Sequence, residues 1–132
     1  MTLGVRGVAI DKESRVLLIR HSYVPGWYLP GGGVEAGETM GEALVREMRE
    51  ECSIALTGPA ELFGLYLNRA VSKRDHVGLY VCRDWTRAAW SPGREIVEAG
   101  FFARDALPKG TTPGTIRRLN EVFDRLKPAE EW

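Results

Sequence analysis

Apolar residues in the first part of the chain come in short runs separated by polar or glycine-containing turns. Two runs of strand length occupy residues 3–10 and 15–21, on either side of the polar segment 11–14. Short apolar runs bounded by turn residues are typical of β-strands, and a short polar turn between two of them favours a hairpin. We therefore predict that these two strands pair with each other.

The periodicity changes between residues 38 and 52, where apolar positions recur every four residues. This stripe consists of Met40, Leu44 and Met48. Residues four apart lie on one face of a helix. Thr39, followed three residues later by Glu42, has the spacing of a capping box at a helix N-terminus. The segment is therefore predicted to be a helix that ends near Cys52.

Strand-like patterns return in the second half of the chain. They occupy residues 53–56, 62–68, 76–85 and 96–103. A polar, basic turn joins the second and third of these runs, which predicts a hairpin. Thr112 and Pro113 suit the start of a helix, whose apolar spacing continues to about Lys127. Several strands with two helices predict one mixed α/β domain over residues 1–132.

The composition argues against a general nucleic-acid binder and against a membrane protein. The 132 residues are 44% hydrophobic, and 18 Lys and Arg balance 18 Asp and Glu. The sequence therefore lacks the basic excess of a general nucleic-acid or membrane-surface binder. Cys52 and Cys82 lack metal-ligand spacing and are expected as reduced thiols, although one disulfide stays open. No apolar run reaches the roughly 18 residues of a membrane span or reads as a signal peptide, so we expect a cytoplasmic protein.

Candidate chemistry is concentrated between residues 29 and 54. Three consecutive glycines, 31–33, form a backbone that can turn sharply and approach a ligand because no Cβ is in the way. In the helix that follows, Glu47, Glu50 and Glu51 fall on neighbouring positions, where like charges repel. A hard divalent cation, which prefers oxygen ligands, would relieve this repulsion. The alternative is a solvated acidic helix face.

The same stretch resembles the signature of the Nudix hydrolases, G-x5-E-x7-R-E-U-x-E-E-x-G-U, in which U is a bulky apolar residue. The matching residues are Gly32, Glu38, Arg46, Glu47, Met48, Glu50, Glu51 and Ile54. One position departs, because Ser53 stands where the family has a glycine just past the helix. A left-handed backbone is common there, so we expect the serine to cost on the order of 1 kcal/mol without removing a ligand.

The resemblance implies an α/β/α sandwich with a mixed β-sheet between helices. It also implies a site for Mg²⁺, with Mn²⁺ as a substitute, held by helix glutamates and a backbone carbonyl of the glycine loop. The groups in those places are Glu47, Glu50, Glu51 and the Gly31 carbonyl. Arg46 and Glu38 stand where the family pairs helix with loop, while Gly31, Gly32 and Gly33 shape that loop.

The implied reaction is hydrolysis of a phosphoric anhydride. A bound metal offsets the negative charge that develops on the attacking and leaving oxygens, and lowers the pKa of the attacking water. Glu47 or a glutamate of a later loop could deprotonate that water. Glu98 is the candidate from the later loop, either as base or as further metal ligand, and Glu95 competes with it. Both could equally be surface charges.

Other candidate substrate contacts lie outside the motif. Arginine and lysine side chains suit phosphate binding, and the candidates are Arg6, Arg20, Arg69, Lys73 and Arg74. Trp27 and Tyr28 are candidates to line a substrate pocket, or else to cover the edge of the core.

The expected substrate is a small nucleotide-type molecule, a nucleoside diphosphate linked to another group. Nucleoside triphosphates, ADP-ribose and nucleotide sugars all fit this description, and the sequence does not choose among them. One alternative is a nucleotide-sensing module that keeps the fold without turnover. Another is an RNA 5′-pyrophosphohydrolase, against which the neutral net charge counts. Both a monomer and a homodimer are compatible with the sequence.

Overall fold

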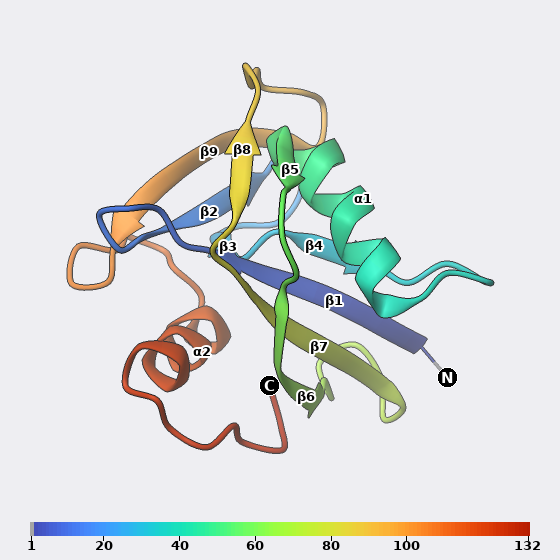
Figure 1. Ribbon diagram of the computed structural model, residues 1–132. Coiled ribbons are helices and arrows are strands. Elements are labelled where there is room, and N and C mark those ends of the chain that lie inside the picture. The colour runs from blue at the N-terminus through green and yellow to red at the C-terminus, as the bar shows by residue number, and fades with distance from the viewer. Residues whose placement is uncertain (1) are drawn as a thin grey trace.

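The computed structural model describes residues 2–132 and contains nine strands and two helices. The strands are β1 (Thr2–Ala9), β2 (Arg15–His21), β3 (Trp27–Tyr28), β4 (Gly31–Gly33), β5 (Ile54–Leu56), β6 (Glu61–Leu67), β7 (Asp75–Cys82), β8 (Trp85–Arg87) and β9 (Ile96–Ala103). The helices are α1 (Met40–Cys52) and α2 (Pro113–Phe123). Figure 1 shows α1 and α2 on opposite sides of the strands. The α/β fold with a mixed sheet is confirmed.

Three sets of hydrogen-bonded strands make up the central layer. A four-stranded set has the order β4-β1-β7-β6, a three-stranded set has the order β3-β2-β9, and β5 pairs with β8. The pair β1–β7 is parallel, and every other pair is antiparallel. The parallel pair sits in the centre of the four-stranded set and makes that sheet mixed.

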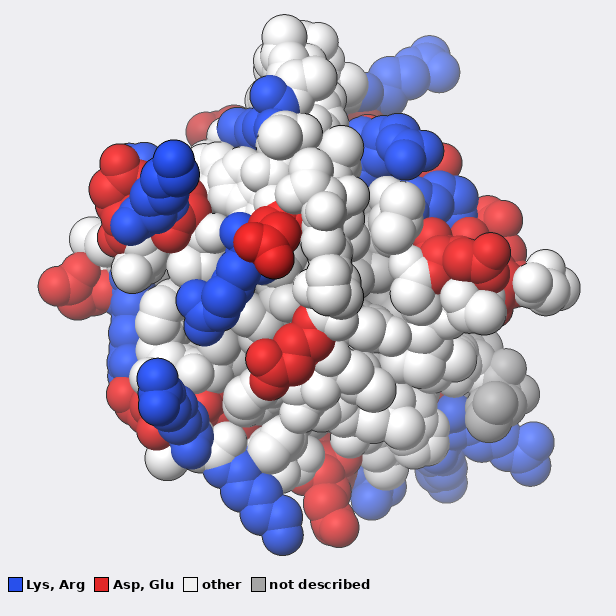
Figure 2. Space-filling view, in the orientation of Figure 1, with Lys and Arg blue, Asp and Glu red and all other residues white. Residues whose placement is uncertain are grey.

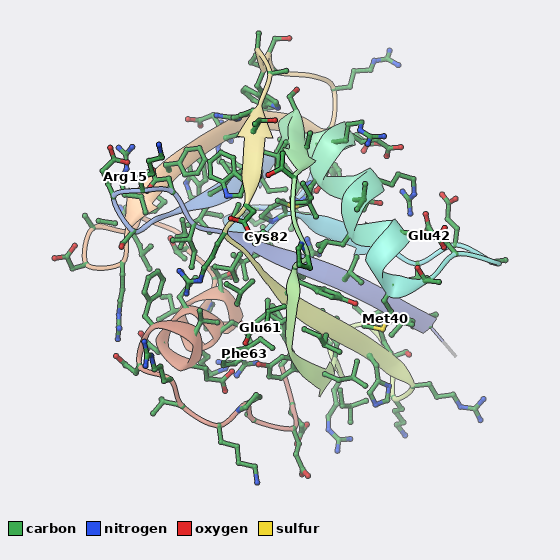
Figure 3. All side chains as sticks on the ribbon, in the orientation of Figure 1. Arg15, Met40, Glu42, Glu61, Phe63 and Cys82 are labelled. Atoms are coloured by element: carbon green, nitrogen blue, oxygen red, sulfur yellow. The ribbon has the colours of Figure 1, made fainter. Side chains whose placement is uncertain are left out.

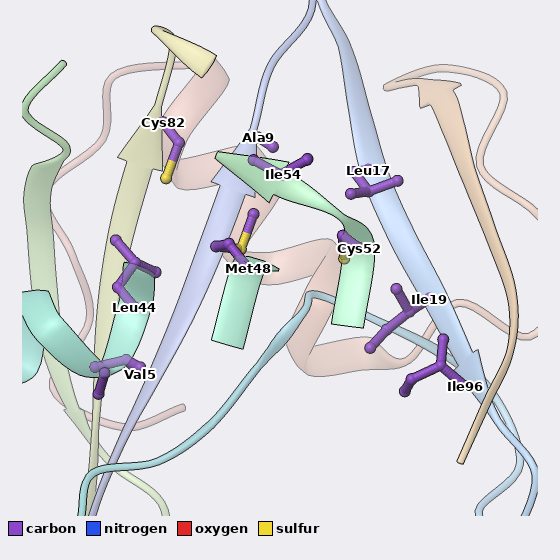
Figure 4. Close-up of a cluster of buried hydrophobic side chains, with 11 residues drawn as sticks. Val5, Ala9, Leu17, Ile19, Leu44, Met48, Cys52, Ile54, Cys82 and Ile96 are labelled. Carbon is purple, nitrogen blue, oxygen red and sulfur yellow. The ribbon is translucent and has the colours of Figure 1, made fainter. Parts of the chain in front are cut away.

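Side chains alternate between the two faces of the central strands, as the period of two requires. On β2, Leu17 and Ile19 pack with α1, whereas Val16 and Leu18 belong to a second cluster that includes Leu119 of α2. Figure 4 shows the α1 cluster, in which Leu44, Met48 and Cys52 of the helix meet β1 and β2. Each helix therefore covers its own face of the strand layer.

Helix α1 begins and ends where the sequence predicts. Thr39 accepts a hydrogen bond from the Glu42 backbone N–H at 3.1 Å, and the Glu42 carboxylate accepts one from the Thr39 N–H at 2.9 Å. Glu42 and Met40 leave the first turn in different directions (Figure 3). The Met40 methyl group lies directly against Gly78 of β7, where any Cβ would collide with it. The capping box fixes the start of the helix, and this close contact seats it on the sheet.

The predicted hairpin of the first two strands is wrong. The chain does turn tightly, because the Asp11 carboxylate accepts hydrogen bonds from the backbone of Glu13 and Arg15. Only Ile10 and Val16 form a bridge, however, and the strands then diverge into different sheets. Both strands are buried on two faces, so they gain more by pairing with β7 and β9 than with each other.

The second predicted hairpin is confirmed, since β6 and β7 pair antiparallel. The run 76–85, predicted as one strand, is broken at Arg83 and Asp84, and Trp85 begins a separate strand that pairs with β5. Helix α2 stops at Phe123 rather than near Lys127. Pro128 disfavours helical backbone at the residue before it, and Arg125 has a positive φ of 54°.

The segment after α2 returns along the open edge of β6. The Leu67 N–H donates to the Glu130 carbonyl at 2.8 Å, and the Trp132 N–H donates to the Leu67 carbonyl at 2.9 Å. These bonds cover part of an edge that would otherwise be exposed. Among residues 2–132, no helix has the length and apolar character needed to cross a membrane.

Candidate active site

Three adjoining cavities follow the side of the molecule where β4 meets α1. The central cavity, about 350 Å³, is lined by Arg6, Tyr28, Gly31, Glu47, Glu51 and Glu95, among others. The loop cavity, about 480 Å³, shares the three glutamates and adds Glu50, Trp90 and Arg94. The helix cavity, about 450 Å³, shares Arg6 and Tyr28 and adds Val77, Thr112, Arg117 and Trp132. Shared lining residues place the three cavities next to one another, and together we call them the cleft.

The glycine run allows β4 to lie against both β1 and α1. Gly31 has a φ of 153°, and a Cβ on it would collide with the Val5 carbonyl oxygen. A Cβ on Gly32 would stand 2.5 Å from Oε1 of Glu47, whereas nothing lies within 4 Å of a Cβ on Gly33. Two of the three glycines are therefore needed for close approach, one to the neighbouring strand and one to a candidate metal ligand.

Glu51 joins the glycine loop to the helix. Its Oε1 accepts a hydrogen bond from the Gly31 backbone N–H at 2.8 Å. Burial raises the pKa of the Glu51 carboxyl to about 7, with a smaller contribution from the Glu47 charge, against the lowering effect of the Gly31 N–H. A half-buried carboxylate beside a second carboxylate favours positive charge nearby. Arg6 supplies one such charge to this cavity, and a metal ion would supply more.

Arg46 connects three parts of the motif through its guanidinium. Its guanidinium donates to both oxygens of Glu38 at 2.8 Å, to the Gly33 carbonyl at 3.0 Å and to Oε1 of Glu47 at 2.8 Å. Its hydrogen bonds lower the pKa of Glu38 to about 2. The pairing of Glu38 and Arg46 predicted from the motif is present, and it connects the start of α1 to the glycine loop.

The donor set suits Mg²⁺, because the cleft presents carboxylate oxygens and backbone of the glycine loop together. The three glutamates are not yet gathered around one point. Glu47 is bonded to Arg46, and the Glu50 side chain is 61% exposed. Among the described residues, no three His, Cys, Asp or Glu side chains are already placed to hold an ion. The chemistry of these oxygen donors fits the metal, and Glu47 and Glu50 would have to turn towards Glu51 to hold the ion with it.

Comparison with known proteins shows which family has this sequence and fold. The family model described as "NUDIX domain" matches residues 1–122. An ADP-ribose pyrophosphatase from Methanocaldococcus jannaschii is 36% identical over 81% of this chain and 64% of its own length. The MutT NUDIX hydrolase structure from Burkholderia pseudomallei is 28% identical, with a TM-score of 0.79 over 92% of this chain and 97% of that one.

This chain belongs to the Nudix family. An 8-oxo-dGDP phosphatase from Homo sapiens is a further relative, 42% identical over 78% of this chain and 36% of its own length. The chain thus spans less than two thirds of the length of either curated relative.

The position that departs from the Nudix signature has the backbone expected of the glycine it replaces. Ser53 caps α1 with φ 56° and ψ 31°, in the left-handed region. Its N–H donates to the carbonyls of Arg49 and Met48, which satisfies two acceptors of the last helical turn. Ser53 therefore keeps the family geometry at a local conformational cost.

Six candidates lie outside the Nudix cleft: Arg20, Trp27, Arg69, Lys73, Arg74 and Glu98. Glu98 and Arg20 form an ion pair across β9 and β2, with Nη2 2.6 Å from Oε1, and neither lines the three cavities. Trp27 packs edge-on against Phe102, with ring centroids 5.2 Å apart, and belongs to the core cluster on the α2 side. Tyr28, its neighbour on β3, lines the cleft instead, because successive strand residues face opposite ways.

Of the remaining candidate site residues, Arg6 and Glu95 line the cleft and Arg69 does not. Arg6 lines the central cavity and donates to the Leu29 carbonyl at 2.8 Å. Burial lowers the pKa of Arg6, while Glu51 and Glu47 favour its charged form. Arg69 pairs with Glu131 instead of facing the glutamates. Of the two late glutamates, Glu95 is the one that lines the cleft.

Sequence reasoning missed His21 as a residue of the Nudix cleft. It lines the central cavity, and its ring lies 5.6 Å from that of Tyr28. Burial lowers the pKa of His21, with a further contribution from the Arg6 charge, so the ring favours its neutral form. A histidine at a strand end has no periodic signal. Only the strand pairing reveals its position, because it sets His21 opposite Ile96 and the Ser22 N–H against the Glu95 carbonyl.

Proposed function

We propose that this chain catalyses divalent-metal-dependent hydrolysis of a phosphoric anhydride bond in a nucleoside diphosphate linked to another group. The observation that carries the proposal is the half-buried Glu51 carboxylate, which accepts a hydrogen bond from the Gly31 N–H and lines the central cavity together with Glu47. The names of the relatives, ADP-ribose pyrophosphatase and 8-oxo-dGDP phosphatase, support a compact nucleotide as substrate.

The residues have distinct roles in this proposal. Glu47, Glu50, Glu51 and the Gly31 carbonyl would hold Mg²⁺, or Mn²⁺ in its place. The ion would offset phosphate charge and make water more acidic. Arg46, through Glu38 and the Gly33 carbonyl, fixes the helix against the loop. Arg6 contributes a positive charge to the same cavity, where it would contact substrate phosphate. Glu95 or Glu47 would accept the proton of the attacking water.

The helix cavity would hold the nucleobase. It adjoins the glutamates through Arg6 and Tyr28, and its apolar wall includes Val77 and Trp132. Aromatic and apolar walls with a few polar groups suit a flat base, which buries its faces and hydrogen-bonds at its edge. A base in this cavity would place the anhydride beside Glu51 and the leaving group towards the loop cavity.

The test is a panel of nucleoside triphosphates, oxidised triphosphates, ADP-ribose, nucleotide sugars and triphosphate-ended RNA, assayed with Mg²⁺ and Mn²⁺. We expect turnover of at least one compact nucleotide, and a loss of at least about 100-fold in Glu51→Gln. Glu61→Gln is the matched control, because Glu61 is exposed on β6 and lines none of the three cavities. Unchanged turnover in Glu51→Gln would refute the assignment.

Activity on triphosphate-ended RNA but on none of the free nucleotides would indicate that the substrate is RNA. The surface gives little support for that outcome. On the face shown in Figure 2, Lys and Arg side chains are scattered among Asp and Glu and form no continuous basic stripe. Binding of a polyanionic backbone normally uses such a stripe.

A further inference from the structure

The C-terminal end of α1 is held by two side chains, one from the last residue of β8 and one from the segment that follows this strand. The last carbonyls of a helix have no partner within it. Here the indole Nε1 of Trp90 donates to the Glu51 carbonyl at 2.7 Å, and Nε of Arg87 donates to the Cys52 carbonyl at 3.1 Å. In Figure 1 this segment passes over the end of α1. The backbone of a proposed metal ligand is therefore fixed from outside the helix.

The two side chains are themselves braced. Arg87 pairs with Ile54 in the β5–β8 ladder, and the Ala88 N–H donates to the Ser53 carbonyl at 2.9 Å. The Arg87 guanidinium carbon lies 5.9 Å from the Trp90 ring centroid and 5.6 Å from that of Phe101. Cations stacked on aromatic faces are attracted to them. We call Arg87 and Trp90 together the brace. Their side chains pack on each other, and a backbone hydrogen bond from Ala88 connects this segment to Ser53, just past the helix.

Glu51 is consequently held at both ends. The Gly31 N–H fixes its carboxylate, and the Trp90 indole fixes its carbonyl. Trp90 also lines the loop cavity together with Glu47 and Glu50, so the brace lies beside the proposed metal ligands. If the carbonyl were released, the last turn of α1 would fray, and the Glu51 carboxylate would lose its fixed direction.

We propose that Trp90 is a positioning residue of the active site, which acts through its hydrogen bond to the Glu51 carbonyl. It holds the last turn of α1, which carries Glu50 and Glu51, in the conformation that sets the Glu51 carboxylate against the Gly31 N–H. The inference rests on the proposed function, because it assigns to these glutamates the role of ligands. Trp90 itself transfers no proton and contacts no reacting atom.

The test uses Trp90→Phe, which keeps an aromatic ring and removes the N–H donor. The matched control is Trp85→Phe. Trp85 belongs to the same strand region, but its Nε1 donates to the Ile10 carbonyl at 3.2 Å, away from α1. Mn²⁺ binding to the full chain is measured by electron paramagnetic resonance without substrate, and kcat and KM are measured on the best compound of the panel.

We expect Trp90→Phe to bind Mn²⁺ about tenfold more weakly and to lose about tenfold in kcat, the usual effect of removing a group that orients a metal ligand. KM should change less than twofold, and the melting temperature should stay close to that of Trp85→Phe. Trp85→Phe should bind Mn²⁺ as the unmodified protein does. A purely packing role for Trp90 would lower the melting temperature and leave both Mn²⁺ affinity and kcat unchanged.

A folded Trp90→Phe variant with unchanged Mn²⁺ affinity and kcat would overturn the proposal. If that variant does not fold, Arg87→Lys is used, which keeps the positive charge but removes the Nε donor to Cys52, and the same weakening is expected. Unmodified protein that binds Mn²⁺ but turns over none of the panel would refute the proposed function, while the Mn²⁺ measurement still decides the role of Trp90. Unmodified protein that binds no Mn²⁺ would overturn both.

Discussion

The guanidinium of Arg46 donates hydrogen bonds to both carboxylate oxygens of Glu38, with Nε–Oε2 and Nη2–Oε1 distances of 2.8 Å each. Lysine cannot make this planar, two-pronged contact. We expect Arg46→Lys to lower kcat about tenfold, because the glycine loop is then free to move relative to α1. Arg104→Lys is the control, since Arg104 makes a similar two-pronged pair with Asp124 away from the motif. Equal activity of the two variants would contradict the prediction.

The same pair predicts how stability depends on pH. Hydrogen bonds from Arg46 lower the pKa of Glu38 from 4.5 to about 2 in the folded chain. The stabilisation is therefore present above pH 4.5 and is lost as the pH falls towards 2. Melting temperatures measured between these values should fall less steeply for Glu38→Gln than for the unmodified protein. Parallel pH profiles would contradict the lowered pKa of Glu38 in the folded chain.

Adjacent glycines of β4 should respond differently to the same substitution. In Gly32→Ala the new methyl group would displace the Glu47 carboxylate, which lies 2.5 Å from the Cβ position, so we expect kcat to fall about tenfold or more. The fold should tolerate the change, because the displaced atoms end a flexible side chain. Gly33→Ala, with open space around its Cβ, should keep full activity. Steady-state kinetics of the two purified variants distinguish these outcomes.

Restoring the family glycine should stabilise the chain. Ser53 occupies the left-handed region at φ 56°, a conformation that glycine adopts without steric cost. We expect Ser53→Gly to raise the free energy of unfolding by about 1 kcal/mol, or roughly 4 °C in melting temperature. Its kcat should be unchanged because the serine side chain supplies no proposed ligand. Urea unfolding measures the gain, and a loss of stability would show that the serine side chain makes a compensating contact.

A buried charge cluster secures the last residues on the sheet. Arg118, only 1% exposed, donates to Glu121 at 3.1 Å and stacks 4.3 Å from the ring centroid of Tyr66 and 5.2 Å from that of Trp132. Removing one partner leaves the other charge buried, so Arg118→Ala should destabilise the fold by about 3–5 kcal/mol. The double variant Arg118→Met/Glu121→Leu should recover part of this loss. Chemical denaturation of both variants checks the order.

The sequence predicts α1 well because its signals are local. Thr39 and Glu42 mark the start, the four-residue stripe gives the buried face, and the Nudix motif places Glu38 and Arg46 within reach of each other. Strand partners are harder to predict, since any apolar run can pair with several others. The local pattern predicted that β1 pairs with β2. In the structure β1 pairs with β7, which buries both faces of the strand.

The remainder of the site depends on contacts between distant residues. Trp90 and Glu51 are 39 positions apart, and no periodic pattern marks a loop tryptophan as a partner of a helix carbonyl. Glu98 is the candidate that the sequence puts forward, with Glu95 as its competitor. The register of β9 with β2 pairs Glu98 with Arg20, whereas Glu95 lines the cleft. Long-range geometry of this kind becomes visible only in the folded chain.

The parallel pairing of β1 with β7 sets Thr2 opposite Asp75, which lies 73 positions later in the chain. The Nudix motif lies in the loop of chain between these two strands. Contacts of such long sequence separation close a large loop and slow folding. During synthesis the Nudix motif is complete at Ile54, but β7 ends only at Cys82. At about 5–20 residues per second, the ribosome exposes the acidic helix for seconds before its sheet can form. We expect nascent chains released before Cys82 to remain without the cleft and to be targets for chaperones.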